Sequence, residues 1–381
     1  MVILESLLAA LLSILVYKFV VQKQGTTLSY LFTYGLVFPT VFLGPFALCK
    51  VLSVRNQAFR FSLGAIHPVT CLFKTTAAAH GFTPSYAKAS TKSFALYFSC
   101  PMMMERDPKL DKFVPVTLSE FFSHVPSFFK MILVTGMLLS MFLYFPNLVP
   151  PLAQGNLPAD SDYYAISAFL RPQDWLLRNM LFGIFFQVIL SAFGEGLIMA
   201  QSLVTGYKTN ILMDNPCLTA RSLSEFWGSK WNLVIHDVLK CGVYQPVRKH
   251  FPKHVAMLST FLASGVFHEI LLWVFSYPLD NSHGCFDQSD TVGKPYCYRP
   301  HIFTTTIFFI YQAVFIALEF SPLGNLPFWG KIPTPIAAIL VVMMGSPFGH
   351  YFVEPYWNSL FFENALAMFF VFKPVDMKIA T

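Results

Sequence analysis

One histidine inside an apolar stretch of this chain is the best candidate for chemistry. His268 and Glu269 lie near the middle of residues 255–277, and they are the only side chains of that stretch that ionise readily near neutral pH. As a helix, the stretch would measure roughly 34 Å at about 1.5 Å per residue, which is enough to cross a bilayer. Polar groups at that depth are costly unless paired or wet, so they commonly mark a functional site, and histidine is suited to accepting a proton. A hydrogen bond between two helices is an equally simple explanation for His268.

A second candidate segment, residues 221–232, has the sequence RSLSEFWGSKWN. Its Ser222 and Glu225 have the S-x-x-E spacing of a capping box, which predicts that a helix begins here, just after a turn at residues 215–216. Four apolar residues then recur at helical spacing and predict one apolar face on that helix: Trp227, Trp231, Val234 and Val238.

Asn232 is the polar residue of this segment that is best placed to meet a ligand. It would lie one helical turn after Gly228, where the missing side chain lets a ligand approach the backbone closely. The amide of Asn232 can bond either a carbonyl oxygen or a nearby base. An interfacial amphipathic helix anchored by tryptophans is the structural alternative for the whole segment.

The composition places these residues in a membrane protein. Hydrophobic residues make up 55% of the 381 residues and charged residues only 12%, which is far from the balance of soluble domains. The net charge of +6 is broken up by long apolar runs, so it indicates loop asymmetry across a bilayer and not nucleic-acid binding.

The apolar runs predict an all-α, polytopic fold with about eight or nine transmembrane helices in a single membrane-embedded domain, residues 1–381. The strongest predicted spans are 3–21, 28–52, 127–148, 176–204, 255–277, 302–320, 333–352 and 356–373. Region 57–103 mixes charged residues and histidines with apolar runs, which favours interfacial or re-entrant helices there. Glu195 and His350 are polar residues in apolar stretches, and each either lines the same cavity as His268 or makes a structural hydrogen bond.

The charges of the connecting segments predict the orientation. Residues 206–254 carry seven basic and three acidic side chains, so we expect this segment on the cytosolic side. The more acidic segments 146–174 and 278–301 are then lumenal. Cys285 and Cys297 share the second of these, and they could pair there.

Several known signatures are missing from the sequence. None of the ten histidines is followed five residues later by aspartate, and there is no G-x-S-x-G elbow. The seven cysteines show no C-x-x-C spacing, and no cluster of residues has metal-ligand spacing, so we expect no metal site.

The order and spacing of three motifs resemble the wax-synthase-like branch of the membrane-bound O-acyltransferase (MBOAT) family. These are residues 226–232 (FWGSKWN), residues 243–247 (VYQPV) after Asp237, and residues 264–269 (SGVFHE). The resemblance is best over residues 215–277. Other branches of the family have a tyrosine and acidic or aromatic residues inside the first motif, where this chain has Trp227 and Gly228. This departure favours the wax-synthase-like branch over the diacylglycerol branch.

The resemblance implies an MBOAT-like helical bundle in the endoplasmic reticulum membrane that joins a fatty acyl group from acyl-CoA to a long-chain alcohol. Its catalytic histidine and asparagine fall on His268 and Asn232, with Glu269 in a supporting role. The implied acyl-CoA-binding residues are Phe226, Trp227, Gly228, Lys230, Trp231 and Arg248. The acyl-CoA is a co-substrate and no cofactor is expected. The expected partners are acyl-CoA, the lipid alcohol and membrane lipids, with no nucleic acid.

Two alternatives remain open at this level. A sterol or diacylglycerol acceptor needs the same chemistry, because the choice of acceptor depends on pocket shape. A membrane transporter with a proton relay through His268 and Glu269 would also explain buried ionisable groups, although such a relay does not require the motif at 226–232.

Overall fold

The computed structural model describes residues 2–107, 109–110, 112–144, 172–276, 301–321, 331–358 and 361, and most of these are helical. In chain order, the elements are α1 (Val2–Val16), η1 (Tyr17–Val21), α2 (Thr27–Phe32), η2 (Thr33–Val37), α3 (Phe38–Val51), α4 (Gln57–His80), α5 (Ser85–Lys88), α6 (Thr91–Ser99), β1 (Arg106–Asp107), β2 (Lys112–Phe113), α7 (Leu118–Tyr144), α9 (Pro172–Thr205), α10 (Pro216–Thr219), α11 (Leu223–Glu225), η4 (Phe226–Lys230), α12 (Leu233–Leu239), η5 (Lys240–Tyr244), α13 (Gln245–Arg248), α14 (Lys253–Ser276), α15 (Thr304–Glu319), α16 (Thr334–Gly345) and α17 (Gly349–Asn358), where η marks a π-helical turn.

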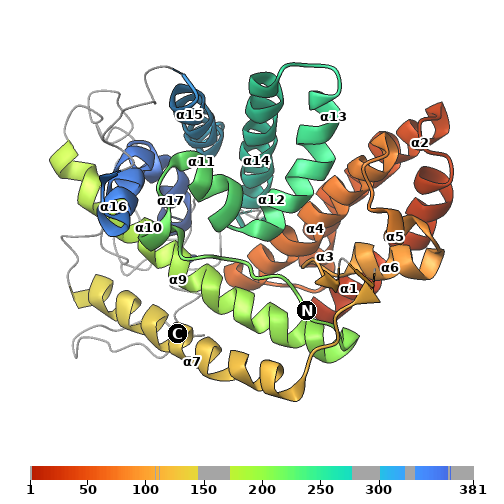
Figure 1. The fold of residues 1–381 in the computed structure, drawn as a ribbon, viewed down its shortest axis with the longest axis horizontal. Coiled ribbons are helices and arrows are strands. Elements are labelled where there is room, and N and C mark those ends of the chain that lie inside the picture. The colour runs from red at the N-terminus through yellow and green to blue at the C-terminus, as the bar shows by residue number, and fades with distance from the viewer. Residues whose placement is uncertain are drawn as a thin grey trace.

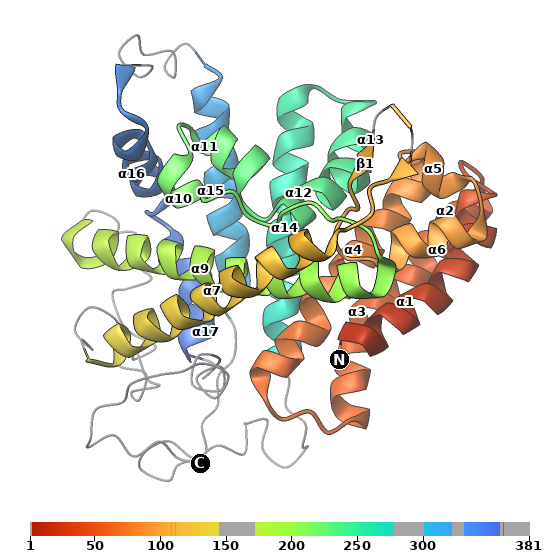
Figure 2. The ribbon, with the colours of Figure 1, turned by 60° about the horizontal axis from the view of Figure 1, so that its bottom comes forward.

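The helices form two groups with a central pair between them. Helices α1 to α6 lie on one side and α15 to α17 on the other, while α12 and α14 stand between the groups (Figures 1 and 2). Helices α7 and α9 pack side by side along one edge of the molecule. The all-α fold predicted from the sequence is therefore confirmed.

Five helical segments are long and apolar enough to cross a membrane. They are Leu4–Val21, Thr27–Val51, Leu118–Phe142, Leu176–Thr205 and Lys253–Ser276. Helices α15 and α16 are apolar but shorter. The protein is thus a multi-pass membrane protein, and the total of eight or nine spans stays a prediction. Most of the predicted span 356–373, together with Cys285 and Cys297, lies outside the described residues.

Two predicted spans differ from the observed helices. Helix α7 begins at Leu118, nine residues before the predicted span at 127, because Thr117 and Glu120 form a reciprocal cap: Thr117 Oγ1 accepts from the Glu120 N–H at 3.2 Å, and the Glu120 carboxylate accepts from the Thr117 N–H at 3.0 Å. The predicted span 333–352 is wrong as one helix. It breaks between α16 and α17, where Ser346 precedes Pro347 and is disfavoured in a continuing helix.

Residues 57–80 were predicted to form an interfacial or re-entrant helix, and how this segment lies relative to a membrane stays a prediction. These residues form α4, one continuous helix that is buried along most of its length. Two of its buried polar side chains pair with other protein groups. Lys74 Nζ donates to the carbonyl oxygens of Tyr97 at 2.7 Å and Cys100 at 2.6 Å, and His67 Nδ1 lies 2.8 Å from the Glu5 carboxylate. Internal pairing of this kind permits polar residues in a helix that no water reaches.

Two glycines let α14 approach its neighbours closely. A Cβ at Gly265 would lie 2.7 Å from the Cα of Thr306 in α15, and a Cβ at Gly64 of α4 would lie 2.9 Å from Leu271 Cδ1 in α14. A larger side chain at position 265 would meet the backbone of α15 and force the two helices apart, whereas one at position 64 would displace the Leu271 side chain. Helix α14, which carries His268, is therefore held between α4 and α15.

Candidate active site

The helix at residue 223 begins as the sequence predicts. Ser222 Oγ accepts from the Glu225 N–H at 3.0 Å, and the Glu225 carboxylate accepts from the Arg221 N–H at 2.7 Å. This confirms the capping box. Glu319, at the end of α15, also accepts from the N–H groups of residues 223 and 224, at 2.5 and 2.9 Å. Two carboxylates thus fix the start of the segment that carries the tryptophans.

This segment does not continue as the single helix that the spacing of its apolar residues predicts. Helical structure stops at Lys230, Trp231 is extended, and Asn232 has the left-handed conformation with φ 41°. Asparagine tolerates this conformation better than most residues, and its side chain favours the N-cap position. The Oδ1 of Asn232 accepts from the Ile235 N–H at 3.4 Å and so caps α12. Residues 234 and 238 therefore lie on a different helix from the tryptophans.

The three aromatic side chains of the motif form one stacked cluster. The rings of Phe226 and Trp231 are stacked with centroids 5.2 Å apart, and Trp227 packs against both. The indole N–H of Trp227 donates to Gln312 Oε1 at 3.2 Å. Gln312 is a buried polar residue of α15 that our sequence analysis missed. Its isolation between aromatic residues of an apolar helix was the available signal.

His268 presents one ring nitrogen to its own helix and keeps the other open. Its Nδ1–H donates to the carbonyl oxygen of Ser264 at 2.7 Å, which fixes the neutral tautomer with the lone pair on Nε2. Among the described residues Nε2 has no hydrogen-bond partner. The rings of Phe309 and Phe352 hold the imidazole, with centroids 4.7 and 5.4 Å away. His268 is therefore oriented to accept a proton at Nε2.

His268 and Asn232 line the same apolar cavity, which has a volume of about 560 Å³. Helix α9 lines this cavity from Asn179 to Leu197, a rise of roughly 27 Å at about 1.5 Å per residue. The volume lies in the range of ligand sites, and the length approaches the roughly 30 Å thickness of a bilayer core. Phe226, Trp227, Gly228 and Trp231 belong to the wall as well. The hydrogen bond of the Asn232 side chain to the Ile235 N–H uses Oδ1. The Nδ2 of Asn232 has no partner among the described residues.

Glu269 points away from this cavity. Its Oε1 accepts from the hydroxyl of Thr305 at 2.5 Å and from the backbone N–H of Thr306 at 3.0 Å, both in the first turn of α15. It is buried, and it is not part of the cavity wall. Glu269 thus holds α15, and with it Phe309, against α14. Among the described residues no direct hydrogen bond joins Glu269 to His268, as a two-residue proton relay would need.

The basic side chains of segment 206–254 differ in whether they line the cavity. Lys230 Nζ lies 2.9 Å from Asp214 and 3.6 Å from Glu225, and the hydrogen bond to Asp214 raises the pKa of this amine. Arg248 donates to the carbonyl oxygen of Phe251 at 3.2 Å. Neither lines the cavity, whereas Lys240 does.

The two weaker candidates lie outside the cavity wall. Glu195 lies 2.6 Å from Nδ1 of His124, which links α9 to α7, so its structural alternative is confirmed. His350 is buried, and its neighbours Gly349 and Phe352 line the cavity while it does not. Asn179 is a further buried polar residue of the wall that our sequence analysis missed. Its amide donates to the Ser346 carbonyl at 2.7 Å.

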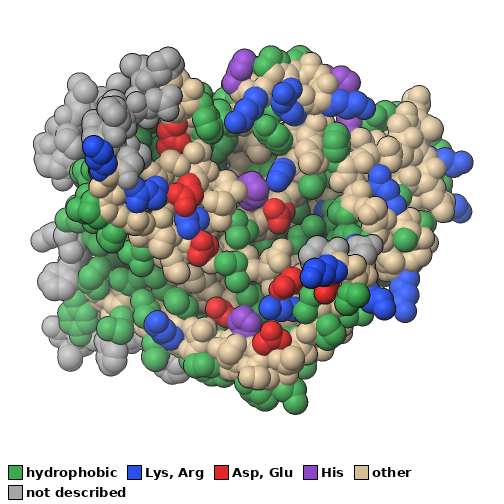
Figure 3. Space-filling model, viewed as in Figure 1, with side chains coloured by type: hydrophobic (Ala, Val, Ile, Leu, Met, Phe, Trp, Pro, Cys, Tyr) green, Lys and Arg blue, Asp and Glu red, His purple; other side chains and the backbone are tan. Residues whose placement is uncertain are grey.

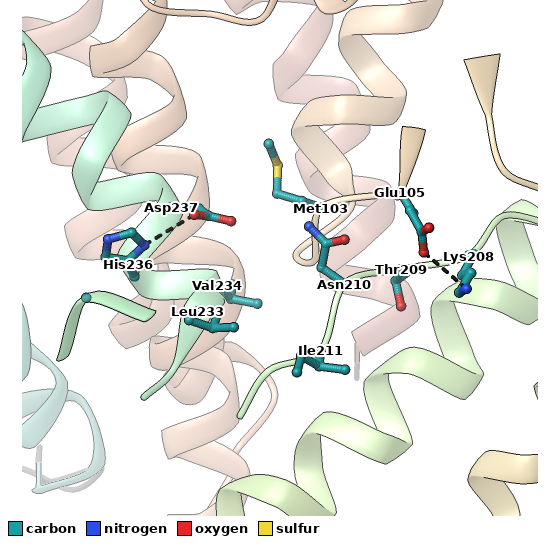
Figure 4. Close-up of a pocket in the computed structure, with 11 residues that line it drawn as sticks. Met103, Glu105, Lys208, Thr209, Asn210, Ile211, Leu233, Val234, His236 and Asp237 are labelled. Atoms are coloured by element: carbon teal, nitrogen blue, oxygen red, sulfur yellow. Dashed lines mark hydrogen bonds and ion pairs between the residues drawn. The ribbon is translucent and has the colours of Figure 1, made fainter. Parts of the chain in front are cut away.

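A second, polar pocket of about 460 Å³ adjoins the apolar cavity (Figure 4). The two share Gly228, Val234 and His236 in their walls. A Cβ at Gly228 would meet no atom within 4 Å, so this position is open. On the corresponding face of the molecule, the surface is hollowed over α12, and charged and histidine side chains gather at its rim (Figure 3).

Comparison with known proteins gives one family and a set of plant relatives. Residues 211–287 match the family described as membrane bound O-acyl transferase, and this range includes Asn232 and His268. A probable long-chain-alcohol O-fatty-acyltransferase 9 from Arabidopsis thaliana is 28% identical over 234 residues, which are 59% of this chain and 54% of the relative. The long-chain-alcohol O-fatty-acyltransferase of Simmondsia chinensis is 40% identical over 62 residues, 14% of this chain and 18% of that protein.

A third relative differs from these two in its named acceptor. The acyl-CoA–sterol O-acyltransferase 1 of Arabidopsis thaliana is 33% identical over 61 residues, 14% of this chain and 18% of the relative. The matched part of this chain therefore spans about half, or less, of the length of each relative.

Proposed function

We propose that this chain, whose residues 211–287 match the membrane bound O-acyl transferase family, transfers a fatty acyl group from acyl-CoA to the hydroxyl of a long-chain alcohol, giving a wax ester and free CoA. The observation that carries the proposal is that Asn232 and His268 line one apolar cavity. The length and apolar lining of the cavity suit a long hydrocarbon chain. The alcohol hydroxyl and the thioester of the bound substrates would then react near Asn232 and His268.

His268 acts as the general base in this proposal. The alcohol oxygen attacks the thioester carbonyl carbon while its proton passes to Nε2, the ring nitrogen without a partner among the described residues. A neutral imidazole does not deprotonate a free alcohol in advance, so proton transfer accompanies attack. General-base help of this kind is worth about 10²–10⁴ in rate.

Asn232 supplies a hydrogen bond to the developing oxyanion. Its Oδ1 is held by the cap to Ile235, which leaves the Nδ2–H groups as donors. A donor of this kind is worth about 10²–10³ in kcat when it lies 2.7–3.1 Å from the oxyanion. Because the cap and the left-handed backbone fix the residue before substrate arrives, the donor costs little reorganisation.

A sterol acceptor is the second candidate, and its support is the similarity to the Arabidopsis sterol acyltransferase. Diacylglycerol requires the same chemistry. In either case Asn232 and His268 keep their roles and only the acceptor part of the cavity differs. We also propose that the protein resides in the endoplasmic reticulum membrane, with residues 206–254 on the cytosolic side where acyl-CoA is available.

An acyl-transfer assay of the purified full chain tests the proposal. Labelled palmitoyl-CoA is offered with hexadecanol, a sterol and a diacylglycerol, each in the same detergent or nanodisc. We expect labelled wax ester from hexadecanol at the highest kcat/KM. If the sterol is labelled in preference, the sterol and not the long-chain alcohol is the acceptor. If monodisperse protein forms no ester from any of the three alcohols, the proposal of acyl transfer is refuted.

A further inference from the structure

His236 stands at the junction of the apolar cavity and the polar pocket. Among the described residues it is the ionisable side chain that lines both. It follows Asn232 by one turn of α12, and its N–H donates to the Asn232 carbonyl oxygen at 3.0 Å, so the two side chains lie on one face of that helix. His268 lines the apolar cavity alone.

Asp237 supports the imidazole of His236. The Nδ1 of His236 lies 3.3 Å from Oδ1 of Asp237, and Asp237 projects into the polar pocket (Figure 4). Both side chains are partly exposed, at 29% and 37%, so the attraction is screened and mainly orients the ring. With Nδ1 directed at the carboxylate, Nε2 is the nitrogen of His236 that has no partner among the described residues.

The proposed acyl transfer, on which this inference rests, produces a thiolate whose departure a second proton-transfer group can assist. As the ester forms, the carbon–sulfur bond breaks and its electron pair leaves with sulfur as a thiolate. The alcohol proton meanwhile sits on His268, inside the apolar cavity. The overall reaction gives a neutral ester and a free thiol, so one proton must be delivered to sulfur where CoA leaves.

We propose that His236 is the general acid that protonates the departing CoA sulfur. The imidazolium of His236 gives its Nε2 proton to the thiolate as sulfur moves from the apolar cavity toward the polar pocket, and it becomes neutral. It regains a proton from water in the open polar pocket, and His268 releases the alcohol proton to water. Protons therefore balance over one turnover, with ester and thiol as the only products.

Lys240 is the competing group, since it is a cation that also lines the apolar cavity. It does not line the polar pocket, whereas His236 lines both spaces and has the Asp237 carboxylate 3.3 Å from its Nδ1. We therefore assign the general-acid role to His236 because of its position at the junction, and not because of charge alone.

Leaving-group dependence tests the proposal directly. Purified full-chain wild type and His236→Gln are compared with hexadecanol and two donors that share one acyl chain, palmitoyl-CoA and S-(4-nitrophenyl) thiopalmitate. The arylthiolate spreads its charge into the ring and leaves without a proton. We expect His236→Gln to lower kcat/KM for palmitoyl-CoA by about 10²-fold, the low end for general-acid catalysis, and to leave the aryl thioester within a few-fold of wild type.

The ratio of the two rates is the decisive quantity, because it does not depend on how much of the variant is folded. Asp237→Asn should shift the ratio in the same direction by less. His268→Ala should lower both rates and keep the ratio, and His250→Gln, at an exposed position of the same segment, should change neither. Equal losses for both donors in His236→Gln, or no loss, would overturn the inference. If wild type forms no ester from either donor, the proposed function falls as well.

Discussion

Asn232 combines a backbone role with a chemical role, and substitutions can separate them. Its φ of 41° is a left-handed conformation, and its Oδ1 caps α12. Alanine loses both features, at roughly 1–2 kcal/mol for the conformation and about 1 kcal/mol for the cap. Glycine tolerates the conformation and replaces the cap at a few tenths of a kcal/mol. Both variants remove the Nδ2–H donors.

We therefore expect Asn232→Gly to keep nearly wild-type thermal stability while kcat falls about 10²–10³-fold, the cost of losing one oxyanion donor. Asn232→Ala should show a similar loss of kcat together with a clear loss of stability, about 2–3 kcal/mol. Asn232→Asp keeps the cap and places a negative charge beside the oxyanion, so its kcat should be no higher than that of the glycine variant. The assay is steady-state ester formation by the monodisperse fraction, with thermal unfolding measured on the same sample. A normal kcat in Asn232→Gly would refute the oxyanion role and leave Asn232 as a structural cap.

Three further predictions concern the surroundings of the site. Lys240→Ala should raise the KM for acyl-CoA and weaken the salt dependence of that KM, because Lys240 lines the cavity. Arg248→Ala should change the KM less, because Arg248 does not line the cavity. Equal KM values for the two variants in steady-state assays would contradict this prediction. Glu269→Gln keeps an oxygen acceptor for the start of α15 and should retain kcat within about tenfold of wild type. Glu269→Ala leaves the Thr306 N–H unpaired and should lower the free energy of unfolding by about 1–3 kcal/mol. Thermal unfolding and turnover measured on the same samples check both expectations, and equal stability of the two variants would contradict the role of Glu269 in anchoring α15. A cysteine at Ser229 should react with an impermeant reagent from the cytosolic side of sealed microsomes, and one at Ser282 only from the lumenal side; labelling of both from one side would disprove the predicted orientation.

The sequence was sufficient to identify the two residues that meet in the cavity. His268 stood out because it is an ionisable group in an apolar stretch, and Asn232 because it lies four residues after Gly228 in the aromatic motif. The capping box at Ser222 was also predictable, since it depends on residues three apart in one turn. These features are local, and local chemistry can be read from spacing.

Features that depend on distant partners could not be predicted in this way. Helix α4 was expected to be interfacial or re-entrant because of its polar residues, and the sequence did not show that Lys74 pairs with carbonyl oxygens of α6 and its C-cap. The direction of Glu269 likewise follows from α15, which begins 35 residues later in the chain. The break at Asn232 went unrecognised because the apolar spacing fitted a continuous helix. The available signals were that asparagine tolerates the left-handed conformation and favours N-cap positions, and Asn232 does both.

Turnover of His268→Ala is the most direct test of the central claim, that His268 takes the proton of the acceptor alcohol. The variant and wild type are purified in parallel, matched for monodispersity, and assayed with labelled palmitoyl-CoA and hexadecanol. Because Nε2 is the ring nitrogen without a partner among the described residues, and His268 lines the cavity that Asn232 also lines, we predict a loss of at least about 10²-fold in kcat. Activity within about threefold of wild type in the well-folded variant, far short of the roughly 10²-fold that a general base contributes, would remove His268 from the mechanism.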